Sequence, residues 1–197
     1  REAYKANPNT IVVLVAGSSM AIGWMDQHIP AIIDAWYPGE QGGTAIAEVL
    51  FGDYNPAGRL PLTFYNSIED LPDFDDYNVK NNRTYMYFEG KPLYAFGYGL
   101  SYTKFDYRNL NIKQDTQNVT LNFSIKNSGK YNGDEVAQVY VKFPDQGIKT
   151  PLKQLKGFKR VHIKKGATEQ ISIEIPKEEL RLWDDQKKQF YTPSGTY

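Results

Sequence analysis

The chain has 197 residues, and its 23 basic and 23 acidic side chains give a formal net charge of zero. Because phosphate binding requires an excess of basic charge on some face, this balance argues against nucleic acid as the main partner. The absence of cysteine excludes disulfides, a thiol nucleophile and a cysteine-based metal site. No apolar run reaches the roughly 18 residues that a membrane-spanning helix needs, so we expect no membrane partner.

The first part of the sequence predicts two buried parallel strands with a helix between them. Residues Thr10–Val15 form an unbroken apolar run rich in β-branched side chains, which is typical of a strand covered on both faces. A loop that contains Gly17 follows, then a helical pattern over Met20–His28 and a second buried strand over Ala31–Trp36. One glycine and two serines in that loop fall far short of a phosphate-binding fingerprint.

An amphipathic helix is predicted next, over Ala45–Phe51, and Gly52 follows it at the usual position of a C-terminal cap. Farther on, Arg59–Phe64 alternates weakly, and Pro61 limits it to an edge strand. Two βα units are too few for a self-sufficient doubly wound domain. We therefore interpret residues 1–72 as a partial α/β sheet. We expect weak stability, because a strand face that should be covered would be exposed.

Residues 73–104 form an aromatic strap between two halves of different pattern. Pro92, Gly97 and Gly99 interrupt any regular element within it. A segment with so much apolar area cannot be a solvated linker, so we expect it to be packed between two modules. Its rings either fill an interface or also line a ligand cleft where the modules meet.

Over residues 105–197 the hydrophobic period changes to two. Apolar and polar residues alternate over Val119–Ile125, Val139–Phe143 and Ile171–Ile175, which predicts antiparallel strands with one buried face. Turn-forming residues separate these runs, and the spacing predicts a small β-sandwich of immunoglobulin or fibronectin type III character. The lack of a cysteine pair favours the fibronectin type. Residues Pro193–Tyr197 read as a turn and the start of another strand, so we expect the sandwich to be incomplete at its C-terminus.

The titratable side chains form no recognisable catalytic or metal-binding pattern. His28 and His162 have no nucleophile partner identifiable by spacing, so we expect both to be structural or at the surface. The possible ligands are scattered, so we predict no metal and no cofactor. Four acidic pairs stand out: Asp75-Asp76, Asp134-Glu135, Glu178-Glu179 and Asp184-Asp185. We expect the last three to be solvated, whereas Asp75-Asp76 either faces a cleft or lies in a plain polar loop.

Several long motifs closely resemble the C-terminal part of glycoside hydrolase family 3. They are NPNTIVVLV, AWYPGEQGGTAIAEVLFGDYNPAGRLPLTF and RTYMYFEGKPLYAFGYGLSYTKF, all within residues 7–105. The later EVAQVYV and PLKQLKGFKRV resemble that family's fibronectin type III-like domain. The resemblance implies an α/β plus all-β fold, with a partial α/β sandwich sheet (1–72), the strap (73–104) and a fibronectin type III-like β-sandwich (105–197). The RTYMYF stretch is more similar to the β-xylosidase branch than to the common β-glucosidases.

The resemblance implies that the full-length protein is a retaining exo-acting β-glycosidase. Such an enzyme needs a carboxylate nucleophile and a carboxylic acid roughly 5 Å apart. In the family, the nucleophilic Asp lies on an N-terminal (β/α)8 barrel and the acid/base Glu lies upstream of the strand matched by Thr10–Val15. Neither position falls in this chain, so we assign no catalytic residue and expect the chain alone to be inactive. The family usually has a proline in the loop occupied here by Gly17–Met20, which puts the rigidity of this loop in doubt.

Tyr85, Tyr87 and Phe88 are the candidate substrate-binding residues, because aromatic rings stack on sugar faces; interface packing is the competing interpretation. The implied partners are an oligosaccharide substrate and the N-terminal barrel and remaining α/β part of the same protein, in the periplasm or outside the cell. The preferred sugar and the oligomeric state, a homo-oligomer included, stay open. Two other functions also stay open: a non-catalytic carbohydrate-binding or scaffold module, and a flavodoxin-like receptor, which the shortage of strands disfavours.

Overall fold

The computed structural model describes all of residues 1–197, which divide into two compact units. The first, called here the α/β unit, comprises residues 1–54, 60–84 and 89–98. The second, the sandwich unit, comprises residues 55–59, 85–88 and 99–197. The aromatic strap is thus shared between the two units in sequence, and its boundaries at residues 73 and 104 stay a prediction.

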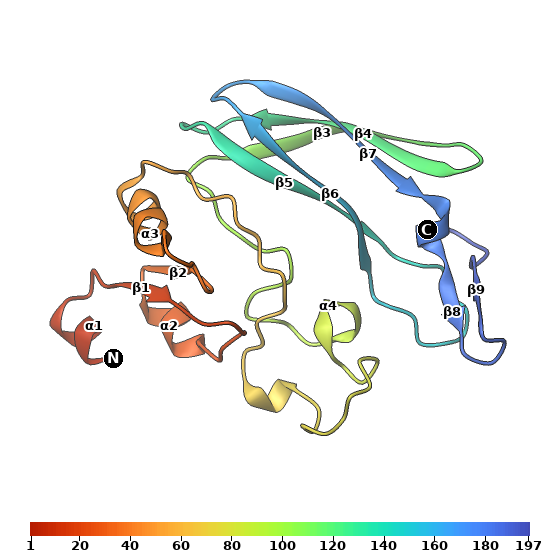
Figure 1. Cartoon of the computed structure of the whole chain (residues 1–197), viewed down its shortest axis with the longest axis horizontal. Helices are drawn as coiled ribbons and strands as arrows, with labels where there is room; N and C mark the ends of the chain where they lie inside the picture. Colours follow the sequence, from red (N-terminus) through yellow and green to blue (C-terminus); the bar gives the residue numbers. More distant parts are fainter. The chain divides into compact units, whose positions relative to one another are not determined.

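The α/β unit is built on a short parallel sheet (Figure 1). Its elements are α1 (Glu2–Ala6), β1 (Ile11–Leu14), α2 (Gly23–His28), β2 (Ala31–Asp34), α3 (Gly42–Phe51) and the 3-10 helix η1 (Ile68–Asp70). β1 and β2 pair in parallel, with Ile11 opposite Ala31. The predicted strand–helix–strand order is confirmed, although β1, α2 and β2 are all shorter than the patterns that predicted them. None of the helices has the length and apolar character needed to cross a bilayer.

The core of the α/β unit is small. Leu14, Ile22 and Phe64 form its buried centre. Leu14 is the only buried residue of β1, and Ile11 is 50% exposed, as expected for a strand of a partial sheet. The predicted edge strand over residues 59–64 is reduced to a single bridge between Phe64 and Tyr94, since the proline at position 61 has no N–H to donate.

The predicted cap of α3 is confirmed. Gly52 ends the helix with φ 84, in the left-handed region that glycine adopts without a Cβ clash. The helix begins at Gly42, three residues before the start that the apolar pattern indicated. The first turn was missed because Gly42, Gly43 and Thr44 carry no apolar side chain that would reveal a buried face.

The sandwich unit has two main sheets (Figure 1). Its strands are β3 (Phe105–Gln114), β4 (Asn118–Asn127), β5 (Gly133–Val141), β6 (Gln154–Ile163), β7 (Thr168–Pro176), β8 (Leu182–Asp184) and β9 (Gln189–Tyr191), with the 3-10 helix η2 (Lys177–Leu180) before β8. One sheet has the order β3-β4-β7, the other pairs β5 with β6, and β8 and β9 form a separate hairpin. All these pairs are antiparallel.

The core of the sandwich unit lies between the two main sheets. Its buried residues come from β4, β5, β6 and β7 and are Phe123, Ile125, Ala137, Ile163, Ile171 and Ile173. A Cβ on Gly157 of β6 would lie 2.7 Å from the Ile173 side chain, so glycine at this position allows the sheets to approach. The alternating runs over Val119–Ile125 and Ile171–Ile175 are confirmed as parts of β4 and β7, whereas the run over Val139–Phe143 extends two residues past the end of β5 at Val141. β3 was not predicted, because most of its side chains are exposed and its register shifts between Arg108 and Asn111.

Candidate functional site

The carboxyl end of the β1–β2 sheet has features of a binding site. In open α/β sheets, ligands bind beyond the carboxyl ends of the strands. Asp34 ends β2, and its Oδ1 accepts a hydrogen bond from the Trp36 backbone N–H at 3.3 Å, whereas its Oδ2 is buried without a hydrogen-bond partner. Burial raises the pKa of Asp34 above its ordinary value, and the Trp36 N–H opposes this only in part. This carboxylate can therefore accept a further hydrogen bond at the sheet edge.

The backbone beside Asp34 is strained. Trp36 has φ 51, in the left-handed region that bulky residues rarely adopt. Its ring packs edge-to-face on Phe64, with 6.4 Å between centroids, so the core holds the residue in this conformation. Strain of this kind concentrates at functional sites. The sequence analysis did not identify Asp34 as a site residue. The only feature of the sequence that could have identified it is that Asp34 is an acidic residue inside an apolar run.

The loop after β1 lies against the segment that follows β2. A Cβ on Gly17 would overlap the Tyr37 ring, so a larger residue at position 17 would displace that ring. Residues 19–21 line a small pocket together with Tyr65, Ser67, Ile68 and Leu71. None of these side chains is a carboxylate, so the pocket does not supply the acid pair that a retaining glycosidase needs.

The helix α4 (Thr84–Tyr87) and Phe88 carry the three predicted substrate-binding aromatics. Tyr87 and Phe88 are each 7% exposed, whereas Tyr85 is only partly buried. The Tyr85 hydroxyl accepts a hydrogen bond from the Leu155 backbone N–H at 3.0 Å. The three side chains therefore share one short segment, and the protein itself fixes the position of Tyr85. Contact of these rings with a substrate stays a prediction.

Further contacts hold this aromatic segment on the sandwich unit. The Tyr85 ring packs edge-to-face on Tyr140, with 6.0 Å between centroids. The Met86 carbonyl accepts a hydrogen bond from the Leu152 backbone N–H at 2.7 Å, and the Gln154 amide group donates to the Met86 sulfur at 3.7 Å. The segment is thus bonded to the residues at the start of β6.

Glu135 is not a solvated charge, and the prediction for this residue was wrong. It is 8% exposed. Its Oε2 lies 2.6 Å from Nη2 of Arg59, and its Oε1 accepts a hydrogen bond from the Tyr107 hydroxyl at 2.7 Å. Burial, together with the hydrogen bond to Glu135, raises the pKa of Tyr107 well above its ordinary value, so this hydroxyl stays a donor. Partners 76 and 28 residues away in the sequence allow the carboxylate to be buried.

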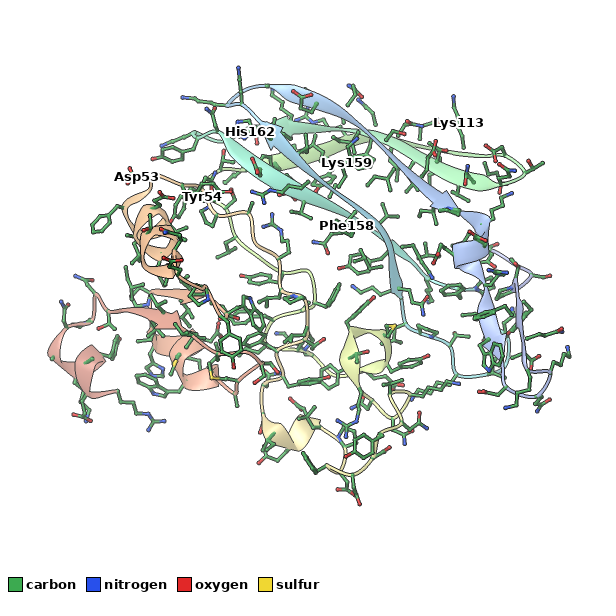
Figure 2. All side chains as sticks on the ribbon, in the orientation of Figure 1. Asp53, Tyr54, Lys113, Phe158, Lys159 and His162 are labelled. Atoms are coloured by element: carbon green, nitrogen blue, oxygen red, sulfur yellow. The ribbon has the colours of Figure 1, made fainter.

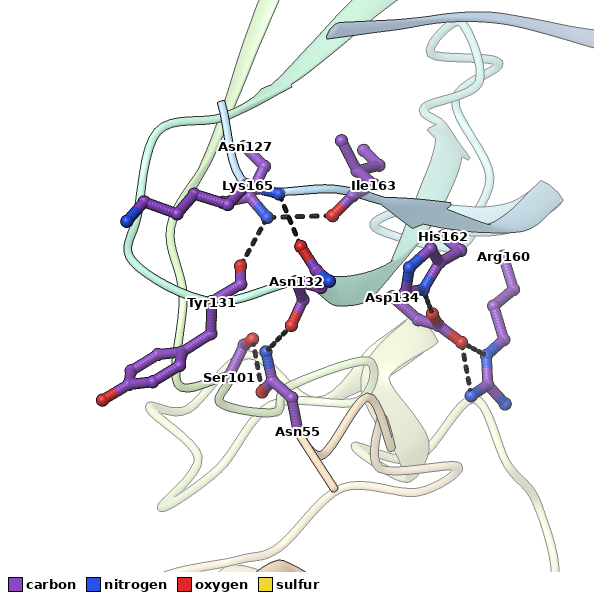
Figure 3. Close-up of polar contacts among 10 residues, drawn as sticks. All are labelled: Asn55, Ser101, Asn127, Tyr131, Asn132, Asp134, Arg160, His162, Ile163 and Lys165. Atoms are coloured by element: carbon purple, nitrogen blue, oxygen red, sulfur yellow. Dashed lines mark hydrogen bonds and ion pairs between the residues drawn. The ribbon is translucent and has the colours of Figure 1, made fainter. Parts of the chain in front are cut away.

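The prediction of a solvated charge was also wrong for Asp134, which is the centre of a charged cluster on β5 and β6 (Figure 3). It lies 2.6 Å from Nη2 of Arg160 and 2.7 Å from Nδ1 of His162, and its side chain is 21% exposed. Partial burial raises the pKa of Asp134, but the hydrogen bonds and charges of His162 and Arg160 outweigh this effect, so the net pKa lies below the ordinary value.

The predicted positions of both histidines are confirmed. His162 is on the exposed side of β6, with a side chain 57% accessible (Figure 2). His28 hydrogen-bonds through Nδ1 to the Trp24 carbonyl at 2.8 Å and stacks on the Trp24 ring, with 4.5 Å between centroids. In these contacts the partners of the two imidazoles are a carboxylate, a backbone carbonyl and an indole ring, and none of these is a hydroxyl nucleophile.

Of the remaining acidic pairs, Asp75-Asp76 lies in a loop, Asp184-Asp185 lies at the start of the β8–β9 turn, and Glu178-Glu179 lies in η2. Asp76 accepts hydrogen bonds from the Asn81 side chain at 2.8 Å and the Asn78 N–H at 2.9 Å, and these contacts lower the pKa of Asp76. Asp184 accepts from the backbone of the β8–β9 turn, which lowers its pKa in the same way. No group of three or more histidine, aspartate or glutamate side chains in the chain could hold a metal ion.

The family models and the relatives that match this chain all point to the same family of proteins. The model of the glycosyl hydrolase family 3 C-terminal domain matches residues 1–102, and that of the fibronectin type III-like domain matches residues 135–197. A xylan 1,4-beta-xylosidase of Xylanibacter ruminicola is 42% identical over 98% of this chain, and a periplasmic beta-glucosidase of Salmonella typhimurium is 38% identical over 90%. The chain spans only 22% and 25% of the length of these two relatives.

Solved structures agree with the sequence relatives. The beta-D-glucoside glucohydrolase of Trichoderma reesei matches with a TM-score of 0.90 at 29% identity, over 97% of this chain and 31% of that protein. The glucose complex of beta-glucosidase 3B from Thermotoga neapolitana matches with a TM-score of 0.82 at 33% identity, over 92% of this chain and 28% of that protein.

Proposed function

Because the chain belongs to glycosyl hydrolase family 3, whose C-terminal part it forms, we propose that the full-length protein is a retaining exo-acting β-glycosidase that releases terminal β-linked sugars from oligosaccharides. One observation carries this proposal: the two domain models match in succession, and relatives named as β-xylosidase and β-glucosidase align with nearly the whole chain. The presence of both domains in succession supports the same reaction class in this protein.

The proposed preference is for β-xylosides over β-glucosides. The relative named as a xylan 1,4-β-xylosidase is more similar to this chain than the periplasmic β-glucosidase, at 42% against 38% identity. The test is to assay the full-length protein on p-nitrophenyl β-D-xyloside and β-D-glucoside and to follow the anomer released by NMR. Faster release from the glucoside overturns the preference. No hydrolysis of either compound, with retained binding to xylan, favours the alternative of a non-catalytic carbohydrate-binding or scaffold module.

The nucleophile and the acid/base of the proposed enzyme come from outside these 197 residues. In support, the chain spans only about a quarter of the curated relatives it matches, and several of its carboxylates already have structural partners. Its proposed role is to complete and support the α/β and barrel parts of the same protein. The purified 197-residue chain should leave aryl β-xylosides and β-glucosides unhydrolysed under conditions in which the full-length protein turns over. Activity of the purified chain above background would overturn this assignment.

The proposed location is the periplasm or the extracellular space. It is supported by the relative whose name is periplasmic beta-glucosidase. Fractionation of cells that express the full-length protein tests this proposal directly.

Tyr85, Tyr87 and Phe88 are the proposed contacts to the sugar. Because Tyr87 and Phe88 are buried, they would act as the rear wall of a subsite, whereas the partly buried Tyr85 would touch the sugar ring. In the full-length protein, Tyr85→Leu should raise KM about three- to tenfold with little change in kcat. The matched control is Phe158→Leu, which replaces an aromatic ring that is 69% exposed on β6 (Figure 2). An unchanged KM in a folded Tyr85→Leu variant leaves interface packing as the role of this ring.

A further inference from the structure

Residues 55–59 have an unusual place in the fold. In the sequence they lie between two stretches of the α/β unit, and yet they belong to the sandwich unit. The match to the fibronectin type III-like domain model begins only at residue 135. We propose that this stretch, the docking segment Asn55–Arg59, is a required part of the sandwich fold, held by that unit as a bound peptide is held by its receptor.

The first end of the docking segment is held by the side chain of Asn55. Its amide group donates to the Asn132 carbonyl at 2.9 Å, and its Oδ1 accepts from the Ser101 hydroxyl at 2.9 Å and the Tyr102 backbone N–H at 2.8 Å. Figure 3 shows Asn55 reaching Ser101 on one side and Asn132 on the other. Asn55 therefore joins the stretch before β3 to the turn before β5.

The turn that receives Asn55 is itself fixed by hydrogen bonds. The Asn132 Oδ1 accepts from the Lys165 backbone N–H at 2.9 Å. The fully buried Asn127 donates to the Tyr131 and Ile163 carbonyls at 2.8 and 2.9 Å (Figure 3). Because these bonds hold the turn before β5 in place without using Asn55, the receptor side of the contact is preorganised.

The other end of the docking segment is held by Arg59. Its guanidinium pairs with Glu135 at 2.6 Å, and the two side chains are only 13% and 11% exposed. Removing one member of a buried ion pair leaves the other charge uncompensated, which is far more destabilising than loss of an exposed pair. Without the docking segment, the sandwich unit would contain a buried glutamate with only the Tyr107 hydroxyl to balance it.

Two glycines of the sandwich unit make room for the docking segment. A Cβ on Gly133 would lie 2.5 Å from Nδ2 of Asn55, and one on Gly99 would overlap the Gly58 carbonyl oxygen. Neither glycine has a positive φ, so close approach, and not backbone conformation, requires glycine at both positions. The hydrogen bonds and the ion pair at the two ends of the docking segment, together with the room that the two glycines leave for it, define a binding site on the sandwich unit.

The proposal is tested on the 197-residue chain by urea unfolding, followed by circular dichroism. Arg59→Met should lower the ratio of folded to unfolded sandwich unit about 100-fold, and adding Glu135→Gln should recover part of that loss because the uncompensated charge disappears. The matched control is Arg160→Met, which breaks an ion pair whose arginine is 55% exposed and should cost no more than about fivefold. Arg59→Lys, which keeps the charge, should lie between wild type and Arg59→Met.

Hydrogen exchange supplies a second readout. If the docking segment is held as one element, Arg59→Met should also speed the exchange of the Tyr102 amide, which is bonded to Asn55 at the opposite end. The proposal is overturned if Arg59→Met costs no more than Arg160→Met, or if the double variant is no more stable than Arg59→Met. Unchanged protection of the Tyr102 amide in Arg59→Met would equally overturn it. If Arg59→Met does not fold at all, the same comparisons are made with Arg59→Lys.

Discussion

The two units of this protein differ in how much of their structure their own residues can stabilise. In the α/β unit, β1 and β2 have four residues each and only one of the eight is buried. In the sandwich unit, β4 and β6 have ten residues each, and six residues form a buried core between the sheets. The two βα units have no further strands beside them, whereas each sandwich sheet is covered by the other.

The buried side-chain oxygens without a hydrogen-bond partner, on Asp34 and Thr63, both lie in the α/β unit, whereas non-glycine residues with positive φ occur in both units. The unpartnered Asp34 oxygen and the positive φ of Trp36 both lie at the edge of the short sheet of the α/β unit. In the sandwich unit the buried charge of Glu135 has two partners. The comparison indicates that the larger buried core, and with it more of the stabilising burial of apolar side chains, lies in the sandwich unit.

The largest expected effect comes from truncating the two cores. Ile125→Ala, at a fully buried position of β4, should lower the free energy of unfolding by about 3–4 kcal/mol, because it leaves a cavity between two covered sheets. Leu14→Ala in β1 should cost about 2 kcal/mol, since the smaller core there can collapse around the change. Urea unfolding by circular dichroism measures both, and Ile112→Ala, at a position 58% exposed, is the control. Equal losses for the two core variants would contradict the comparison.

A smaller effect is expected from adding one methyl group to a glycine in each unit. Gly157→Ala should destabilise the sandwich unit by about 1–3 kcal/mol, because the new Cβ would meet Ile173 between the sheets. Gly43→Ala lies in α3 with no atom within 4 Å of its Cβ, and it should stabilise the helix by about 0.5 kcal/mol. Thermal melting should therefore give a lower Tm for Gly157→Ala and a higher Tm for Gly43→Ala than for wild type. Two Tm shifts of the same sign would contradict the difference in packing around these two glycines.

The pH dependence of stability should differ in sign between two aspartates, one in each unit. The folded pKa of Asp134 is lowered from 3.8, so its ionised form stabilises the fold above pH 3.8, and this contribution is lost as the pH falls through the folded pKa. Asp134→Asn should therefore be less stable than wild type at pH 7, with a difference that shrinks toward pH 3.

Asp34 is expected to behave in the opposite way. Its folded pKa is raised from 3.8 by burial, so its ionised form destabilises the fold at pH 7, and protonation relieves this cost as the pH falls toward 3.8. Asp34→Asn should be more stable than wild type at pH 7 and should lose that advantage in acid. Unfolding curves between pH 3 and pH 7 measure both variants, and a lower stability of Asp34→Asn at pH 7 would mean that the carboxylate has a favourable partner.

Much of the fold could be predicted from local patterns. Alternation over Val119–Ile125 and Ile171–Ile175 predicted parts of β4 and β7, because a strand with one buried face repeats every two residues. The apolar run at Thr10–Val15 predicted β1, and Gly52 predicted the end of α3. β3 escaped prediction since its exposed side chains leave no periodic signal.

The candidate site was less predictable than the strands. Long motifs indicated the glycoside hydrolase family, and the two domain models and the relatives confirmed it. Asp34 was passed over, because an acidic residue is usually solvated and no local pattern shows that its Oδ2 is buried without a hydrogen-bond partner. The roles of Tyr85, Tyr87 and Phe88 stay predictions, since burial alone does not distinguish packing from sugar contact.

The sequence by itself determined the β1–α2–β2 order, the change from a parallel pair of strands to antiparallel sheets, and the family. These properties depend on neighbouring residues or on motifs that can be compared directly. Only the tertiary structure decided that Glu135 is buried and that Asn55–Arg59 belongs to the sandwich unit. The physical reason is that the partners of these residues lie 76 and 77 positions away, and no local pattern records which distant charge or carbonyl will neutralise a buried polar group.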